Sequence, residues 1–372
     1  MQNVHLHISS LPYREARSAP FCSRYLISEA RCHRLFLEVH LPQDCALPNR
    51  RFVALTGTVE DVVTIMENRK PSLFDAIGNT PLVELRNLNG NQRVSILGKL
   101  EGANPGGSVK DRPAYYMISR AEESGEVTKE KTIVEPTSGN MGIALAMIGA
   151  AKGYRVKLFM PECVTTERQG ALAALAAEVV LTPAREGTDG AITRARQFAN
   201  EEPEKYYMPN QFDNESNVLA HYETTGPEIF SQTEGGVDVF VAGMGTTGTL
   251  MGAGRYLKEK KPGVRVVGVE PTEGHTIQGL KNMNESIIPK LYRAEMFDEK
   301  IVVEDGEAFE TTRLLATKEG LFVGMSSGAA VAGALRIAKD MEHGTIVVIL
   351  PDRGDRYLST TLFRSVCAKC PP

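Results

Sequence analysis

Short apolar runs alternate with segments of helical periodicity from residue 71 onward, and this alternation constrains the fold more than any other feature of the chain. Several of the runs are apolar at nearly every position, which is typical of strands covered by helices on both faces. Strands separated by helices predict a mostly parallel α/β architecture. The predicted strands are residues 94–100, 132–135, 156–160, 237–242, 264–269 and 345–350, and the predicted helices are residues 114–124, 142–152, 251–260, 307–320 and 329–340.

Polar, glycine-rich turns follow three of the predicted strands, at residues 136–140, 243–249 and 351–355. In open α/β sheets, ligands bind outside the carboxyl ends of the strands. These three turns lie at such ends, so we expect the chemistry of the protein to gather there.

The length and charge of the chain limit the classes of molecule that it is expected to bind. A chain of 372 residues can bury a substantial core and is expected to form two domains. The net charge of -4 and the lack of a long basic run argue against nucleic acid or an anionic membrane as the main partner. No apolar stretch approaches the roughly 20 residues of a membrane-spanning helix. Small molecules are therefore the expected partners.

Six cysteines are spread unevenly over the chain, which is not the pattern of a disulfide scaffold. This distribution favours a reducing compartment, the cytoplasm. Cys367 and Cys370 have the spacing of a zinc knuckle, but a structural zinc site needs four ligands and no second pair accompanies them. We therefore predict no metal site and an unliganded tail at residues 367–372.

Lys110 lies in the run Asn-Pro-Gly-Gly-Ser-Val-Lys-Asp-Arg at residues 104–112. The glycines allow the backbone to approach a flat ligand, and the polar residues that follow can begin a helix. An isolated lysine of this kind is more often a surface residue. A second loop, Gly-Thr-Thr-Gly-Thr at residues 245–249, offers amide and hydroxyl donors that suit a phosphate monoester. An amine and a phosphate loop together indicate pyridoxal 5'-phosphate.

The second loop also permits a different cofactor. Gly243, Gly245 and Gly248 match the dinucleotide-binding pattern after a predicted strand, and Glu270 ends the next strand, where such folds place a ribose-binding acid. Three threonine hydroxyls favour a terminal phosphate over a pyrophosphate, which is met mainly by backbone amides. No Gly-Lys-Ser/Thr follows the glycines, so an ATP-type loop is excluded. Spacing alone leaves the dinucleotide alternative open.

The ordered set of motifs resembles that of the fold-type II pyridoxal-phosphate enzymes of β-replacement, the cysteine synthases (O-acetylserine sulfhydrylases), and most of all their B type. The resemblance covers residues 75–363. Each motif is weak alone, but the order of all of them makes a chance match very improbable. The matching motifs are residues 78–82, 104–112, 136–142, 210–212, 221–226, 245–249, 326–328 and 352–360.

The resemblance implies two open, twisted, mostly parallel sheets flanked by helices, with the active site between two domains. The larger, phosphate-binding domain would comprise residues 71–104 and 214–366. The smaller, mobile domain would comprise residues 105–213 and carry the lysine. Residues 1–70 form a leader of unknown role, for which we expect disorder. Its seven arginines before Phe52 suggest a transit peptide, but its acidic residues do not fit that class.

The resemblance also implies roles for individual residues. Lys110 would form the Schiff base with the cofactor and then serve as the base that removes the substrate α-proton. Asn140 would bond the phenolic oxygen of the cofactor, and Ser326 would face its pyridine nitrogen, although a serine here also suits a helix N-cap. The phosphate would be held by Gly245, Thr246, Thr247, Gly248 and Thr249, and the substrate carboxylate by the loop and side chains of Thr137, Ser138, Gly139, Met141 and Gln211.

The implied reaction replaces the acetoxy group of O-acetyl-L-serine by sulfide and gives L-cysteine and acetate. Met141 departs from the threonine that similar enzymes usually carry, which leaves the substrate geometry open. Lys281 lies in a segment that presents a cation to phosphate in similar enzymes, so O-phosphoserine is the rival substrate. Cystathionine β-synthase shares the scaffold. From another class, a NAD-binding dehydrogenase or a non-catalytic binding protein stays open.

The resemblance extends to assembly and partners. It implies a homodimer in which each active site is built mainly within one subunit. Thiosulfate or a sulfur-carrier protein serves as sulfur donor in B-type relatives, and serine acetyltransferase binds A-type ones, and the sequence does not choose among these partners.

Overall fold

The computed structural model describes residues 26–28, 35–38, 54–55 and 70–363. The chain divides into two compact units, Met1–Arg69 and Lys70–Pro372. Within the first unit, strands β1 (Leu26–Ser28), β2 (Leu35–Glu38) and β3 (Ala54–Leu55) form an antiparallel sheet. The rest of the expected leader up to residue 69, and the tail with Cys367 and Cys370, lie outside the described residues.

The second unit holds a six-stranded sheet in the order β12-β11-β10-β13-β5-β4. All neighbouring strands are parallel except β4, which runs antiparallel to β5 at one edge. The strands are β4 (Leu82–Glu84), β5 (Val94–Leu100), β10 (Val239–Gly243), β11 (Arg265–Pro271), β12 (Glu299–Val303) and β13 (Gly344–Leu350).

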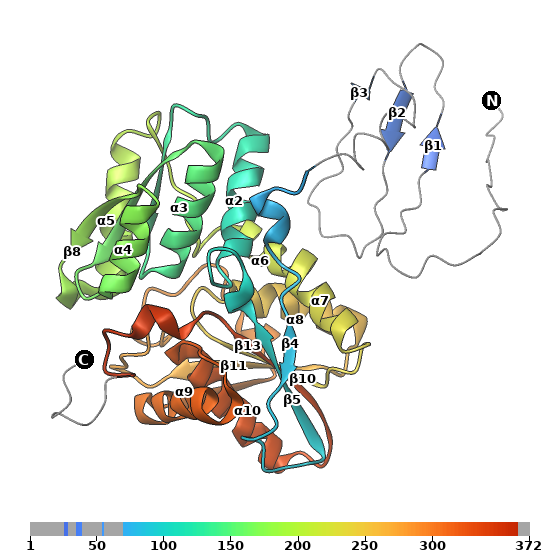
Figure 1. Ribbon diagram of the computed structural model, residues 1–372. Helices are drawn as coiled ribbons and strands as arrows, with labels where there is room; N and C mark the ends of the chain where they lie inside the picture. The colour runs from blue at the N-terminus through green and yellow to red at the C-terminus, as the bar shows by residue number, and fades with distance from the viewer. Residues whose placement is uncertain (1–25, 29–34, 39–53, 56–69, 364–372) are drawn as a thin grey trace. The chain divides into compact units, whose positions relative to one another are not determined.

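Helices cover both faces of this sheet because successive side chains of its strands point to opposite sides. Val239 and Val241 of β10 pack into one core with α9 and α10, whereas Phe240 and Ala242 pack into another with α7 and α8. In Figure 1 the orange helices α9 and α10 lie side by side. The helices of this part are α6 (Glu215–Ala220), α7 (Gly226–Gln232), α8 (Gly248–Lys260), α9 (Asp305–Glu319) and α10 (Met325–Asp340).

A second, four-stranded parallel sheet has the order β8-β7-β6-β9. Ile133 of β6 faces a core with α2 and α3, and its neighbour Val134 faces a core with α5. The green helices of Figure 1 gather around this sheet. Its elements are β6 (Thr132–Pro136), β7 (Arg155–Pro161), β8 (Glu178–Thr182), β9 (Tyr206–Tyr207), α2 (Asp111–Ser124), α3 (Asn140–Lys152), α4 (Thr166–Ala174) and α5 (Gly187–Glu201).

Two open, mostly parallel sheets flanked by helices confirm the predicted fold class. The helices that follow the first two polar turns begin two and three residues earlier than the sequence predicts, at Asn140 and Gly248. The turns therefore supply the first helical residues, and their backbone N–H groups face the carboxyl edge of the sheets. The N-cap of α10 is Gly324, so the alternative of Ser326 as an N-cap is wrong. Among the described residues, no helix is long and apolar enough to cross a membrane.

Candidate active site

A cavity of about 750 Å³ lies where the turns after β6, β10 and β13 meet. Its wall contains residues of all three turns together with residues from the segment that follows β11. The structure thus brings together every predicted site residue except Gly139 and Gly248, which lie behind the wall. The predicted residues that line the cavity are Lys110, Thr137, Ser138, Asn140, Met141, Gln211, Gly245, Thr246, Thr247, Thr249 and Ser326.

The loop before α8 has the properties of a phosphate site. Thr247 adopts a left-handed conformation with φ of 66°, and its buried hydroxyl has no hydrogen-bond partner among the described residues. The first turn of α8 carries no acidic residue, so its N–H groups and helix dipole favour an anion. An unpaired buried hydroxyl costs free energy that a phosphate oxygen would recover.

Glycine is required in this loop because neighbouring atoms approach its backbone closely. A Cβ atom on Gly245 would lie 2.6 Å from the carbonyl oxygen of Gly279, and one on Gly248 would lie 2.2 Å from Asn217 Oδ1. Asn217 in turn donates a hydrogen bond of 3.1 Å to Thr246 Oγ1. Gly248 therefore acts from behind the cavity wall, by leaving room for the residue that orients Thr246.

We expect the substitution Gly248→Ala to weaken the binding of pyridoxal phosphate by at least about tenfold, because the new methyl group displaces Asn217 and with it the Thr246 hydroxyl. Titration of the cofactor-free protein, followed by absorbance, measures this change. Gly306→Ala is the matched control, since a Cβ at that helical position meets nothing within 4 Å. Equal affinities of the two variants would contradict the prediction.

Lys110 is the last residue before α2, and its amine reaches the cavity. Its segment is fastened to the turn after β13, because Val109 donates a backbone hydrogen bond of 2.8 Å to Pro351. Within the described part of the chain, no carboxylate forms an ion pair with the amine. Burial lowers its pKa to about 8, against the opposing charges of Asp352 and Glu101. A larger share of this amine is therefore neutral near physiological pH than in an ordinary lysine.

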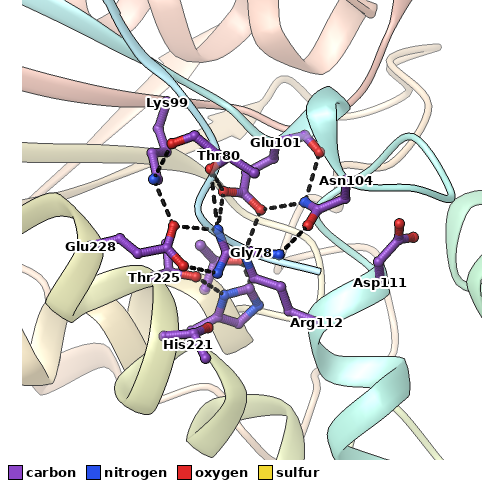
Figure 2. Close-up of polar contacts among 12 residues, drawn as sticks. Gly78, Thr80, Lys99, Glu101, Asn104, Asp111, Arg112, His221, Thr225 and Glu228 are labelled. Carbon is purple, nitrogen blue, oxygen red and sulfur yellow. Dashed lines mark hydrogen bonds and ion pairs between the residues drawn. The ribbon is translucent and has the colours of Figure 1, made fainter. Parts of the chain in front are cut away.

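A buried network of charged side chains anchors the first turn of α2, which follows Lys110 (Figure 2). The guanidinium of Arg112 pairs with Glu101 at 2.7 Å and with Glu228 at 2.6 Å. Lys99 pairs with the second oxygen of Glu228 at 2.7 Å. Arg112 follows Lys110 by two residues, so this network fixes the first turn of α2 and the lysine that precedes it.

The turn after β6 is held in shape by its own first threonine. The hydroxyl oxygen of Thr137 accepts hydrogen bonds from the backbone N–H groups of Gly139 and Gly142, at 2.9 and 3.2 Å. Gly139 has φ of 145° and packs directly against the side chain of Arg168. Met141 lines the cavity but is otherwise packed in the hydrophobic core of the second sheet. The bulk that replaces a threonine is thus largely absorbed by the core.

Gln211 is anchored through a fully buried carboxylate. Its backbone N–H donates to Glu135 Oε1 at 2.9 Å, and its side-chain amide donates to the carbonyl oxygen of Pro136 at 3.0 Å. Burial raises the pKa of Glu135 to about 7, although these hydrogen bonds oppose the shift. The amide of Gln211 is therefore held in one orientation at the cavity wall.

Several residues of the site could not be identified from the sequence. Arg168 is only 2% exposed, lines the cavity and stacks on the ring of Tyr357 at 4.5 Å. Asp189 lies across the cavity and pairs with Lys281 at 2.7 Å. Asp352 contacts Asn140, and the motif at residues 352–360 gives no sign of this contact in the sequence.

The structure argues against the dinucleotide alternative. Glu270 is 2% exposed, and both of its carboxylate oxygens are engaged. One accepts a hydrogen bond of 2.7 Å from the backbone of Met283, and the other pairs with Lys300 at 2.6 Å. The acid expected to bind a ribose is thus a structural residue.

Comparisons with known proteins agree with this geometry. The profile of the family described as pyridoxal-phosphate dependent enzyme matches residues 73–352. The chain is 47% identical over 293 residues to cysteine synthase B of Pseudomonas aeruginosa, which covers 79% of this chain and 97% of that protein. The crystal structure of the cysteine synthase of Entamoeba histolytica is 39% identical, with a TM-score of 0.74, and covers 80% of this chain and 91% of its own. The O-acetylserine dependent cystathionine β-synthase of Helicobacter pylori is also 39% identical, with a TM-score of 0.75, over 80% of this chain and 99% of that one.

Proposed function

The chain belongs to the pyridoxal-phosphate dependent enzymes, and on this premise we propose that it forms L-cysteine and acetate from O-acetyl-L-serine and hydrosulfide. The observation that carries the proposal is one cavity in which a phosphate loop with an unpaired threonine hydroxyl faces a lysine amine of lowered pKa. Neither a dehydrogenase nor a plain binding protein requires this combination. The similarity to cysteine synthases supports the reaction, and the relative described as O-acetylserine dependent supports the substrate.

The residues present fit pyridoxal phosphate. Its phosphate would be held by the loop before α8, its ring oxygen by Asn140 and its pyridine nitrogen by Ser326. When bound, this cofactor supplies the electron sink that lets a bond at the α-carbon break. Ser326 is neutral and, unlike an aspartate, does not force the pyridine nitrogen to keep a proton. The serine therefore limits this electron sink, which favours replacement at the β-carbon.

The protein contributes binding and proton transfer. The substrate carboxylate would be held by the turn after β6, with the amide of Gln211 opposite. Lys110 in its neutral form takes the proton from the α-carbon, and its lowered pKa makes that form accessible near neutral pH. In the overall reaction the acetate leaves with the electron pair of the broken C–O bond, and hydrosulfide forms the new C–S bond. Lys110 then returns the proton to the α-carbon, which gives cysteine.

The most direct test measures absorbance and cysteine formation with the purified protein. We expect a visible absorbance band from the bound cofactor and release of cysteine when O-acetylserine and sulfide are added together. A protein that shows neither the band nor cysteine formation would refute the proposed function.

The ion pair of Lys281 favours O-acetylserine over O-phosphoserine. Lys281 is 7% exposed, and its charge is compensated by Asp189, which also accepts a hydrogen bond of 2.8 Å from the backbone of Ile287. A doubly charged phosphate would have to compete with this fixed carboxylate. We propose that Lys281 is therefore not free to bind the phosphate of a rival substrate.

We expect the wild-type protein to use O-acetylserine at least about tenfold better than O-phosphoserine, as judged by kcat/KM. Asp189→Asn keeps an oxygen for the Ile287 N–H but removes the negative charge, so the preference should fall by about tenfold. Glu186→Gln, which also lies at the cavity but is paired with Arg194, is the matched control. A wild-type protein that turns over O-phosphoserine alone would reverse the assignment.

We further propose how the enzyme is organised. Residues 105–213 would act as the smaller domain and residues 71–104 and 214–366 as the larger one, which is supported by the separate cores of the two sheets. A homodimer in the cytoplasm is supported by the resemblance to cysteine synthases. A sulfur-carrier protein or serine acetyltransferase stays a candidate partner by the same resemblance.

A further inference from the structure

The side-chain amide of Asn140 is held at both ends by charged residues from one distant motif. Its nitrogen donates a hydrogen bond of 2.6 Å to Asp352 Oδ2, and its oxygen accepts one from the guanidinium of Arg356. An ionised carboxylate can only accept hydrogen bonds, and a guanidinium can only donate them. The two neighbours therefore permit a single orientation of the amide, with its nitrogen toward Asp352.

Both charged residues are themselves fixed. Asp352 is 1% exposed, and its Oδ2 also accepts a hydrogen bond of 2.7 Å from the hydroxyl of Tyr357. Arg356 is 5% exposed, and its guanidinium donates to the carbonyl oxygen of Gly106 in the loop that leads to Lys110. A Cβ atom on Gly107 would lie 2.5 Å from this guanidinium, so glycine is needed for its approach. Neither residue can follow a rotation of Asn140.

The second N–H of the Asn140 amide is not needed for the bond to Asp352, and Asn140 lines the cavity. We propose that Asp352 and Arg356 are positioning residues that make Asn140 a hydrogen-bond donor, and never an acceptor, toward the ring oxygen of the bound cofactor. This inference rests on the proposed function, because it assumes that pyridoxal phosphate occupies the cavity. It assigns the motif at residues 352–360 a task at the site, although Asp352 is not in the cavity wall.

The orientation has a measurable consequence. A donor N–H stabilises the ionised form of a ring oxygen and lowers its pKa, whereas a carbonyl oxygen in the same place repels that form and raises the pKa. The titratable and charged groups that share this region are the amine of Lys110, the side chains of Asp352, Arg356 and Arg168, the hydroxyl of Tyr357, and Asp111. Burial raises the pKa of Asp111 to about 7, against the charge of Arg356. The pH at which the visible band of the bound cofactor changes therefore reports whether Asn140 presents its N–H or its carbonyl oxygen to the ring oxygen.

The test compares cofactor-loaded variants at both ends of the amide. In Asp352→Leu and in Arg356→Met the amide is held at one end only, so we expect the pH midpoint of the band to rise. In the double variant both constraints are lost, and the rise should reach about one unit. Arg356→Lys restores a group that only donates, and its midpoint should return to that of the wild type. Asp355→Asn is the matched control from the same motif, because within the described residues its carboxylate forms an ion pair only with the exposed Arg353, at 3.1 Å. Melting temperatures show whether each variant is folded.

The outcomes separate the inference from the proposed function. A wild-type protein without any visible band would overturn both together. A normal wild-type band whose midpoint is unchanged in Asp352→Leu and Arg356→Met would overturn the inference alone. If Asp352→Leu does not fold, the Arg356 variants decide, since a midpoint that differs between methionine and lysine supports the inference and an equal midpoint overturns it.

Discussion

Replacing Lys110 by alanine should lower the rate of cysteine formation by at least about a thousandfold, because the substitution removes the base that we propose for the α-proton. The variant should also lose the covalent link to the cofactor, which reduction with borohydride detects in the wild type. Steady-state rates and mass spectrometry after borohydride treatment measure the two effects. Lys205→Ala, which changes an exposed lysine paired with Glu202, should behave like the wild type. A borohydride-stable adduct in Lys110→Ala would place the link elsewhere.

The same substitution should not destabilise the fold. The lowered pKa of Lys110 means that the folded protein holds the proton less tightly than the unfolded chain does. The protonated amine therefore opposes folding below about pH 8, and this cost shrinks as the pH rises from about 8 to the ordinary lysine value of 10.5. In cofactor-free protein, the gain in unfolding free energy from Lys110→Ala should be largest below pH 8 and vanish above 10.5. A lysine that is kept for function, and not for stability, is expected to oppose folding in this way.

Strands that are buried on both faces are predicted more accurately than strands at the edge of a sheet. The predicted strand at residues 345–350 differs from β13 by one residue, because its last five residues are apolar and buried, as in a strand covered on both sides. Strands β8 and β12 were missed, and each lies at the edge of its sheet. Their exposed positions carry polar residues such as Glu178 and Lys300, so the apolar run is broken. Edge strands of a parallel sheet therefore leave a weaker sequence signal than central ones.

The cavity could be anticipated for a similar reason. Parallel strands end at one edge of their sheet, so turns far apart in the sequence are brought together by the fold class alone. The partners of these turns could not be anticipated. Asp352 contacts Asn140 across 212 residues, and no local pattern encodes which buried polar groups meet. Arg168 gave no signal at all, because an arginine in a short helix is usually exposed.

The charge network around Arg112 leads to a second prediction of a large effect. This effect concerns the stability of the fold and not the rate of the reaction. Glu101 is fully buried and the side chain of Glu228 is 11% exposed, so Arg112 compensates two carboxylates that water hardly reaches (Figure 2). Burial alone would raise the pKa of Glu228, but the hydrogen bonds and charge of Arg112, together with Lys99, outweigh burial and lower it to about 2. The network that surrounds Glu228 is therefore expected to be stable above about pH 4.5 and to weaken as the pH falls toward 2.

Replacing Arg112 by methionine leaves these two carboxylates without their shared cation, and we expect the unfolding free energy at pH 7 to fall by about 3–5 kcal/mol. Denaturant titration measures the loss, and it should shrink below pH 4.5 as Glu228 becomes protonated. Arg112→Lys keeps the charge but not the planar fork that reaches both acids, so its loss should be intermediate. Arg86→Met is the matched control, since Arg86 is 78% exposed and pairs with Glu84, and it should cause no measurable change. If Arg112→Met were no less stable than that control, the network would not hold the segment of Lys110 in place.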